Sequence, residues 1–150
     1  MNARSQGEVI QFRIPGDSRY VPIVRRAILS LARSLGFPEQ TAEDIHISVA
    51  EAITNSVEHG SPGQKHDNVI IACRIEDGVL TIDVRDEGPG FRMPQSGECE
   101  ASMEEHGRGL RLIYNLMDQV KVCRTPKGSR IRMVKINPST GEPLETPASR

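Results

Sequence analysis

The sequence is short of the residues that build several classes of protein. It contains no tryptophan, and its aromatic content is 3%. No apolar run approaches the roughly 20 residues that a bilayer-spanning helix needs. These shortages disfavour a base-stacking or carbohydrate-binding platform and predict that the chain does not contact a membrane. The stretch from Met1 to Glu8 is polar and lacks a signal-peptide core, so we expect a cytoplasmic protein.

The sequence also has few cysteines and almost no net charge. The three cysteines, Cys73, Cys99 and Cys123, are widely spaced and form no CxxC pair, which argues against a disulfide framework and a structural zinc site. We expect Cys73 and Cys123 to be small buried residues of strands. The 150 residues include 19 basic and 20 acidic ones, for a formal net charge of −1. This balance argues against direct binding to nucleic acid, and the length allows one domain.

The first part of the chain predicts one strand and two helices. Residues 8–14 are rich in β-branched and aromatic side chains and end at Pro15, which is typical of a strand followed by a turn. Apolar residues at three- and four-residue steps predict a helix over 18–35. A second helix is expected to extend to about residue 60, with Thr41 and Asp44 in a capping arrangement at its start.

The second part predicts a hairpin, a long irregular segment and further regular elements. Two β-branched runs, 69–75 and 79–85, flank an Asp-Gly pair that is typical of a hairpin turn. Residues 87–107 lack periodicity, and we interpret them as a mobile lid. A helix and two strands follow, at 109–117, 119–124 and 129–136. This order favours an α+β two-layer sandwich over residues 8–136, with a mixed, mostly antiparallel sheet covered by helices on one face, and a disordered tail over 137–150.

The first of three polar motifs lies on the second predicted helix. Glu51, Asn55 and His59 are spaced by four residues and therefore share one stripe, while Ile47 and Ile53 are expected to face inward. A glutamate can act as a general base, and an asparagine carbonyl is a hard oxygen ligand suited to Mg²⁺. On its own, the stripe is more simply explained as an exposed polar face.

The second motif follows a predicted strand and contains Asp86, Gly88 and Gly90. A buried aspartate at a strand end can accept a hydrogen bond from an exocyclic amine. The two glycines let the backbone approach a flat ring closely. Alone, this motif describes a turn that ends a strand.

The third motif, Gly107-Arg108-Gly109, begins the helix predicted after the irregular segment. A helix that starts with glycines presents free backbone N–H groups and the positive end of its dipole, which together attract an anion such as phosphate. Alone, the motif is equally a simple helix cap.

In this order, the three motifs resemble the ATP-binding domain of the GHKL superfamily, which has the Bergerat fold. Residues 51–60, 86–91 and 107–110 are most similar to RsbW-type anti-sigma factor serine/threonine kinases, and the resemblance covers roughly residues 12–136. It implies a protein kinase that uses ATP and Mg²⁺, sequesters a sigma factor and phosphorylates a STAS-domain anti-sigma factor antagonist. It also implies a homodimer.

The resemblance implies a role for each matching residue. Glu51 would take the proton from the attacking hydroxyl, and Asn55 would ligate Mg²⁺. Asp86 would accept the adenine amino group, with the Ser129 hydroxyl nearby. Two glycines would shape the base pocket, namely Gly88 and Gly90. Three residues would hold the ATP phosphates, namely Gly107, Arg108 and Gly109.

Two questions stay open at the level of sequence. The arginines of the first predicted helix form either a solvated face or part of the surface that recognises sigma factor and antagonist, as the corresponding helix does in this family. The candidates are Arg19, Arg25 and Arg26. The alternative function is a nucleotide-gated protein-binding regulator with little phosphotransfer and a target other than a sigma factor.

Overall fold

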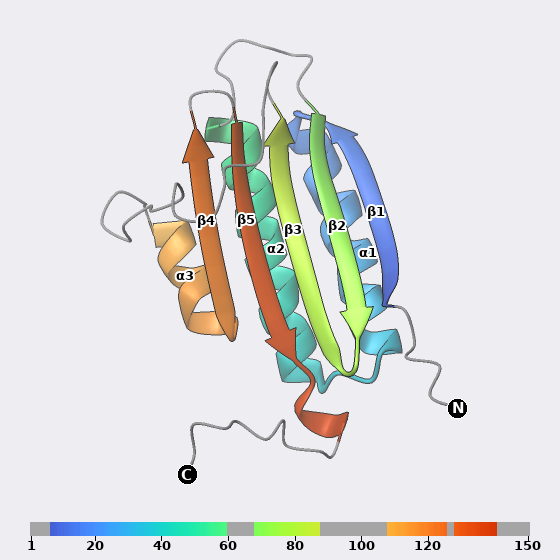
Figure 1. Ribbon diagram of the computed structural model, residues 1–150. Coiled ribbons are helices and arrows are strands. Elements are labelled where there is room, and N and C mark those ends of the chain that lie inside the picture. Colours follow the sequence, from blue (N-terminus) through green and yellow to red (C-terminus); the bar gives the residue numbers. More distant parts are fainter. Residues whose placement is uncertain (1–6, 60–67, 88–107, 126–127, 141–150) are drawn as a thin grey trace.

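A computed structural model of the chain describes residues 7–59, 68–87, 108–125 and 128–140, which form a sheet with helices on one face (Figure 1). The strands are β1 (Glu8–Pro15), β2 (Asn68–Glu76), β3 (Val79–Glu87), β4 (Gln119–Thr125) and β5 (Gly128–Ile136). The helices are α1 (Val21–Ser34), α2 (Glu39–His59) and α3 (Arg108–Leu116), and short 3-10 helices lie at Ser18–Tyr20 (η1) and Pro138–Thr140 (η3). None of the described helices is long and apolar enough to cross a membrane.

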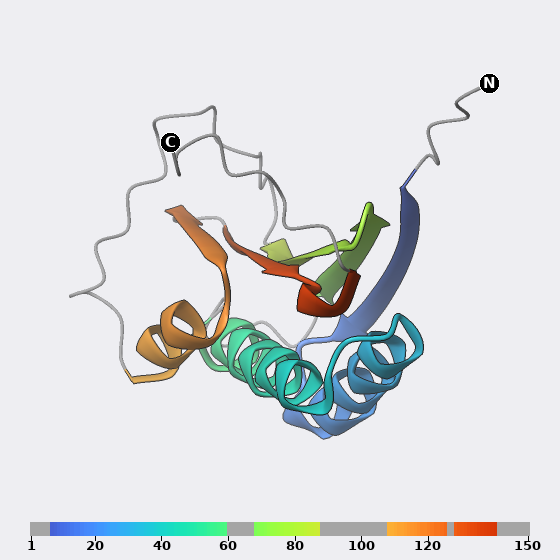
Figure 2. The ribbon, with the colours of Figure 1, turned by 90° about the horizontal axis from the view of Figure 1, so that it is seen from below.

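The sheet has five strands in the order β1-β2-β3-β5-β4, and each neighbouring pair is antiparallel. All three α-helices pack on the same side, so two layers are visible edge-on (Figure 2). The predicted hairpin turn is confirmed, since Asp77 and Gly78 have φ values of 49° and 73° between β2 and β3. The predicted α+β sandwich is therefore confirmed, and the described pairings are antiparallel without a parallel component.

The start of α2 differs from the sequence expectation. The helix begins at Glu39, where the Pro38 carbonyl accepts a hydrogen bond from the Ala42 amide at 2.8 Å. Thr41 lies within the first turn of the helix, so the predicted Thr41 cap is wrong. Gly36, at a φ of 81°, adopts the left-handed conformation that separates α1 from α2.

The core lies between the sheet and the helices. On β3, Leu80, Ile82 and Val84 are completely buried, because alternate residues of a strand face the same side. Ile53 on α2 is also completely buried, but Ile47 is 39% exposed, which contradicts the expectation that both face inward. Six residues correspond to a rotation of about 240° around a helix, so the two isoleucines lie on different faces.

The chain remains ordered beyond the last strand. Asn137 is 4% exposed, and its side-chain amide donates to the Leu35 carbonyl at 3.3 Å. The Ser139 hydroxyl donates to the Gly36 carbonyl at 2.7 Å. The expectation of disorder is therefore wrong for residues 137–140, because polar side chains there bond to the carbonyls at the end of α1. Residues 141–150 lie outside the described residues.

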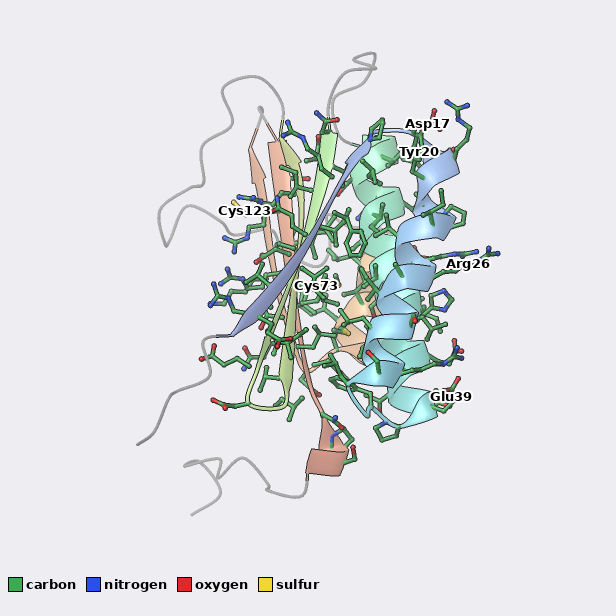
Figure 3. All side chains as sticks on the ribbon, turned by 90° about the vertical axis from the view of Figure 1, so that its right-hand side faces the viewer. Asp17, Tyr20, Arg26, Glu39, Cys73 and Cys123 are labelled. Carbon is green, nitrogen blue, oxygen red and sulfur yellow. The ribbon has the colours of Figure 1, made fainter. Side chains whose placement is uncertain are left out.

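Two cysteines lie on opposite faces of the sheet (Figure 3). Cys73 is free and completely buried between the layers, and burial raises the pKa of its thiol to about 12. Cys123 is 5% exposed on the face away from the helices and is disulfide-bonded. The prediction of burial is confirmed for both. The disulfide of Cys123 does not follow from the sequence, where the wide spacing argues against a disulfide framework, because sequence spacing does not limit distance in the fold.

Candidate functional site

The elements that carry the three motifs are neighbours in the fold. Helix α2 and strand β3 run toward the same end of the molecule, where β5 begins (Figure 1). Helix α3 lies beside α2 in the helical layer and runs in the opposite direction (Figures 1 and 2). Residues that are distant in sequence are thereby brought to neighbouring elements.

Glu51 and Asn55 occupy successive turns of α2 and are both half-buried. They flank the apolar stripe that contains the completely buried Ala52 and Ile53. A four-residue step places side chains on the same side of a helix, so the carboxylate and the amide share one flank. The predicted shared stripe is thus present for these two residues, while the side chain of His59 lies outside the described part.

The Glu51 carboxylate lies against the start of α3. Gly109 is the second residue of that helix, and a Cβ atom built on it would come within 2.5 Å of Glu51 Oε2. A residue with a Cβ atom at this position would therefore require the Glu51 carboxylate to shift. This contact joins the first and third sequence motifs, although sequence reasoning assigned Gly109 to phosphate binding alone.

Asp86 is 2% exposed near the end of β3. The register pairs its Cα with Val69 on β2 and with Ser129 on β5. Because side chains alternate along a strand, Asp86 faces the same side as the buried Val84, toward the helices. The structure thus brings Asp86 and Ser129 together and directs the aspartate to the layer that contains Glu51.

A second aspartate on β3 faces the other way. Asp83 accepts hydrogen bonds from the Nε atoms of Arg130 at 2.6 Å and of Arg132 at 3.2 Å. Burial raises the pKa of the Asp83 carboxyl, but the hydrogen bonds and positive charges of the two arginines outweigh it and hold that pKa below its ordinary value. Sequence reasoning gave this cluster no role. Asp83 and Asp86 are three residues apart on one strand, so the sequence alone indicates that their side chains face opposite sides of the sheet.

Several predicted site residues lie outside the described residues, namely Gly88, Gly90 and Gly107. Arg108 begins α3, and its side chain is also outside the described part. The irregular segment interpreted as a lid is likewise almost entirely outside it. Among the described residues, no group of three or more His, Cys, Asp or Glu side chains is arranged to hold a metal ion.

The arginines of the first helix differ in their surroundings. Arg19 pairs with Asp17 at 2.8 Å before α1 begins. The Nε atom of Arg25 is buried without a hydrogen-bond partner in the described part of the chain. Arg26 is exposed and points away from the sheet (Figure 3). Of the three candidates, Arg26 is the most available to a partner.

The described residues fit a nucleotide with a hydrated divalent cation. A buried carboxylate at a strand end can accept a hydrogen bond from an exocyclic amine, as Asp86 would from adenine. The glycine at the start of α3 lets the Glu51 carboxylate lie where a Cβ atom would otherwise be. Mg²⁺ usually keeps several waters and binds phosphate oxygens, so one protein oxygen such as that of Asn55 suffices.

The chain matches the family described as the histidine kinase-like ATPase domain over residues 14–135. This match covers most of the chain, which therefore belongs to that family. Membership of an ATPase-domain family implies that the protein uses a nucleotide.

Named relatives give the type of protein within the family. The chain is 29% identical over 141 residues to the serine-protein kinase RsbW of Bacillus subtilis (strain 168), with 88% of each chain covered. It is 33% identical over 122 residues to the serine-protein kinase RsbW of Listeria innocua serovar 6a, with 75% of this chain and 78% of the relative covered. The protein is thus a serine/threonine kinase of the RsbW type, which confirms the resemblance seen in the motifs.

Two solved structures share the fold. The RsbU and RsbW domains of a Mycobacterium tuberculosis protein match with a TM-score of 0.65 and 16% identity, covering 86% of this chain and 32% of that one. The histidine kinase domain of a blue-light activated kinase from Erythrobacter litoralis matches with a TM-score of 0.55 and 21% identity, covering 83% and 62%. At these identities, the likeness concerns the fold alone.

Proposed function

We propose that this protein binds Mg-ATP between α2, the end of β3 and the start of α3, and transfers the γ-phosphoryl group to a serine or threonine of a STAS-domain anti-sigma factor antagonist. It also sequesters a sigma factor and releases it when the unphosphorylated antagonist competes. The observation that carries the proposal is the position of the Glu51 carboxylate, on α2 with Asn55 and against Gly109 at the start of α3.

In this proposal, Glu51 is the general base. Its carboxylate accepts the proton of the attacking hydroxyl while the hydroxyl oxygen forms a bond to the γ-phosphorus. The bond between that phosphorus and the β–γ bridging oxygen breaks, and ADP leaves. Phosphoryl transfer needs positioning and charge neutralisation more than covalent help from the protein, so the start of α3 and an ion held by Asn55 provide the remaining stabilisation.

The base pocket is assigned to the end of the sheet. Asp86 accepts a hydrogen bond from the adenine amino group, and Ser129 contributes a hydroxyl from the adjacent strand. Support comes from the deep burial of Asp86 and from its register with Ser129, which the sequence motif alone does not establish. Gly88, Gly90, Gly107 and Arg108 complete the site as the motifs predict.

The partner surface is assigned to α1 of a cytoplasmic homodimer. Arg26 is exposed there, and Ile23, one turn earlier, is 64% exposed, so the helix offers a cation beside an apolar contact. Such a combination suits a protein partner with an acidic residue next to an apolar one. Arg26→Glu should weaken capture of the sigma factor and leave nucleotide affinity unchanged.

A phosphoproteomic comparison tests the kinase assignment. The purified protein is incubated with Mg-ATP and a lysate of its own host, and new phosphorylation sites are identified by mass spectrometry. Glu51→Gln keeps the size of the side chain but removes its basicity, whereas Glu58→Gln changes an exposed glutamate on the same helix and serves as the matched control. We expect a phosphoserine or phosphothreonine on a small STAS-domain protein with wild type and Glu58→Gln only.

The other outcomes separate the two candidate functions. A phosphoprotein that forms equally with Glu51→Gln contradicts the role of Glu51 as base. ATP binding and partner capture without any new phosphoprotein contradict kinase activity and support a nucleotide-gated protein-binding regulator instead.

A further inference from the structure

The end of the Glu51 side chain, on α2, occupies the space that a Cβ atom at Gly109, on α3, would need. The Cβ atom that an alanine at position 109 would carry lies 2.5 Å from Glu51 Oε2, 3.5 Å from Cδ and 4.0 Å from Cβ. Only the first of these distances is shorter than ordinary van der Waals contact. A methyl group at position 109 therefore conflicts with the carboxylate and with no other part of Glu51.

A methyl group at position 109 should cost little folding free energy but should displace the Glu51 carboxylate. The atom in conflict is the far end of a flexible, half-buried side chain, so the carboxylate can rotate away without movement of the backbone. A general base must lie within about 2.6–3.2 Å of the proton that it accepts. A displacement of about 1 Å at a reacting group can reduce a rate by about 100-fold.

We propose that Gly109 is a positioning residue for Glu51: by having no side chain, it leaves the space in which the carboxylate lies against the first turn of α3. This inference rests on the proposed function of Glu51 as the base. The backbone segment assigned to the ATP phosphates then also sets the position of the proton acceptor. One helix start thereby provides both the proposed phosphate contacts and the space for the base.

Gly109→Ala tests the inference by separating binding from transfer. We expect the dissociation constant for Mg-ATP, measured by equilibrium dialysis, to change less than about threefold, while phosphoryl transfer to the STAS-domain substrate falls by about 100-fold. Asn115→Ala changes an exposed residue of the same helix and should alter neither quantity. Equal losses in affinity and rate, or no loss in rate, would overturn the inference.

A shorter base provides the rescue test. Glu51→Asp withdraws the carboxylate by one methylene group and leaves room for a methyl group at position 109. In the Glu51→Asp background, Gly109→Ala should therefore reduce transfer by only about twofold, against about 100-fold with Glu51 present. An equally large reduction in both backgrounds would mean that Gly109 acts on the phosphates or on α3 itself, and would overturn the positioning role.

Thermal unfolding gives a measure that is independent of the reaction. Alanine is a better helix former than glycine, so Gly109→Ala should raise Tm by about 2 °C where Glu51 is replaced by alanine, and by less or not at all where Glu51 is present. Equal changes in the two backgrounds would overturn the inference. Absence of phosphotransfer in all variants, with this difference in Tm retained, would overturn the proposed function and leave the contact established.

Discussion

Two carboxylates of β3 are separated by the alternation of side chains along the strand. Asp83 and Asp86 are three residues apart and therefore face opposite sides of the sheet. Asp83 is bound by two arginines of β5 on the face away from the helices. Asp86 is buried toward the helical layer, where the proposed base pocket lies. The first carboxylate thus stabilises the sheet, and the second is the one that we assign to recognition of adenine.

The lowered pKa of Asp83 predicts a pH dependence of stability. A carboxyl group with a lower pKa in the folded state stabilises the fold above its unfolded pKa of about 3.9, and this contribution is lost as pH falls through the folded value. Asp83→Asn should therefore lower the free energy of unfolding by about 1–2 kcal/mol at pH 7. The difference in free energy of unfolding between Asp83→Asn and wild type should shrink as the pH is lowered below about 4.

Urea unfolding of both chains at several pH values between about 7 and 3 checks this prediction. Asp77→Asn removes an exposed carboxylate from the β2–β3 hairpin and controls for the change in net charge. If the free energies of unfolding of Asp83→Asn and wild type differed by the same amount at every pH, the Arg130 and Arg132 contacts would not depend on the charge of Asp83.

At the scale of elements, the end of the described chain supports the turn between α1 and α2. The Asn137 side chain donates to the Leu35 carbonyl, and the Ser139 hydroxyl of η3 donates to the Gly36 carbonyl. The backbone N–H of Asn137 donates to the Gly78 carbonyl at 2.8 Å. One short segment therefore connects the end of α1, the β2–β3 hairpin and the last strand. Helix ends need such partners because their last carbonyls have none within the helix.

Truncation distinguishes this anchor from the rest of the tail. Removal of residues 137–150 should lower Tm by about 4–10 °C, since it removes several hydrogen bonds that are each worth about 1 kcal/mol and leaves carbonyls of the α1–α2 turn without partners. Removal of residues 141–150 alone retains every contact described above and should change Tm by less than about 2 °C. Differential scanning calorimetry of the two truncated chains measures both values. Equal losses in the two chains would contradict the anchoring role of residues 137–140.

Much of the fold could be predicted from the sequence because each element carries its own periodicity. The hairpin turn, the three helices and the five strands follow from local patterns. The position of β5 between β3 and β4 does not, because periodicity indicates which face of a strand is buried and gives no information about its neighbours. For the same reason the motifs identified Glu51 and Gly109 separately, but the contact between them depends on how α2 packs against α3.

At the scale of the whole molecule, the two-layer architecture accounts for the separation of the three motifs along the chain. The helices that carry the first and third motifs cover the face of the sheet toward which the buried Asp86 of β3 points. Binding of a nucleotide at this junction would contact both layers. The ligand would therefore stabilise the folded domain as a unit.

The effect of ATP on Tm tests this last point and separates binding from catalysis. A ligand that binds only the folded state at 100 times its dissociation constant adds about 2.7 kcal/mol, which for a chain of this size raises Tm by about 5–10 °C. Mg-ATP should produce this shift in wild type and in Glu51→Gln, because the proposed base acts on the incoming hydroxyl. Asp86→Asn replaces the proposed adenine acceptor by an amide and should lose most of the shift at the same ATP concentration. A full shift with Asp86→Asn would remove Asp86 from the base pocket, and a lost shift with Glu51→Gln would assign Glu51 to nucleotide binding.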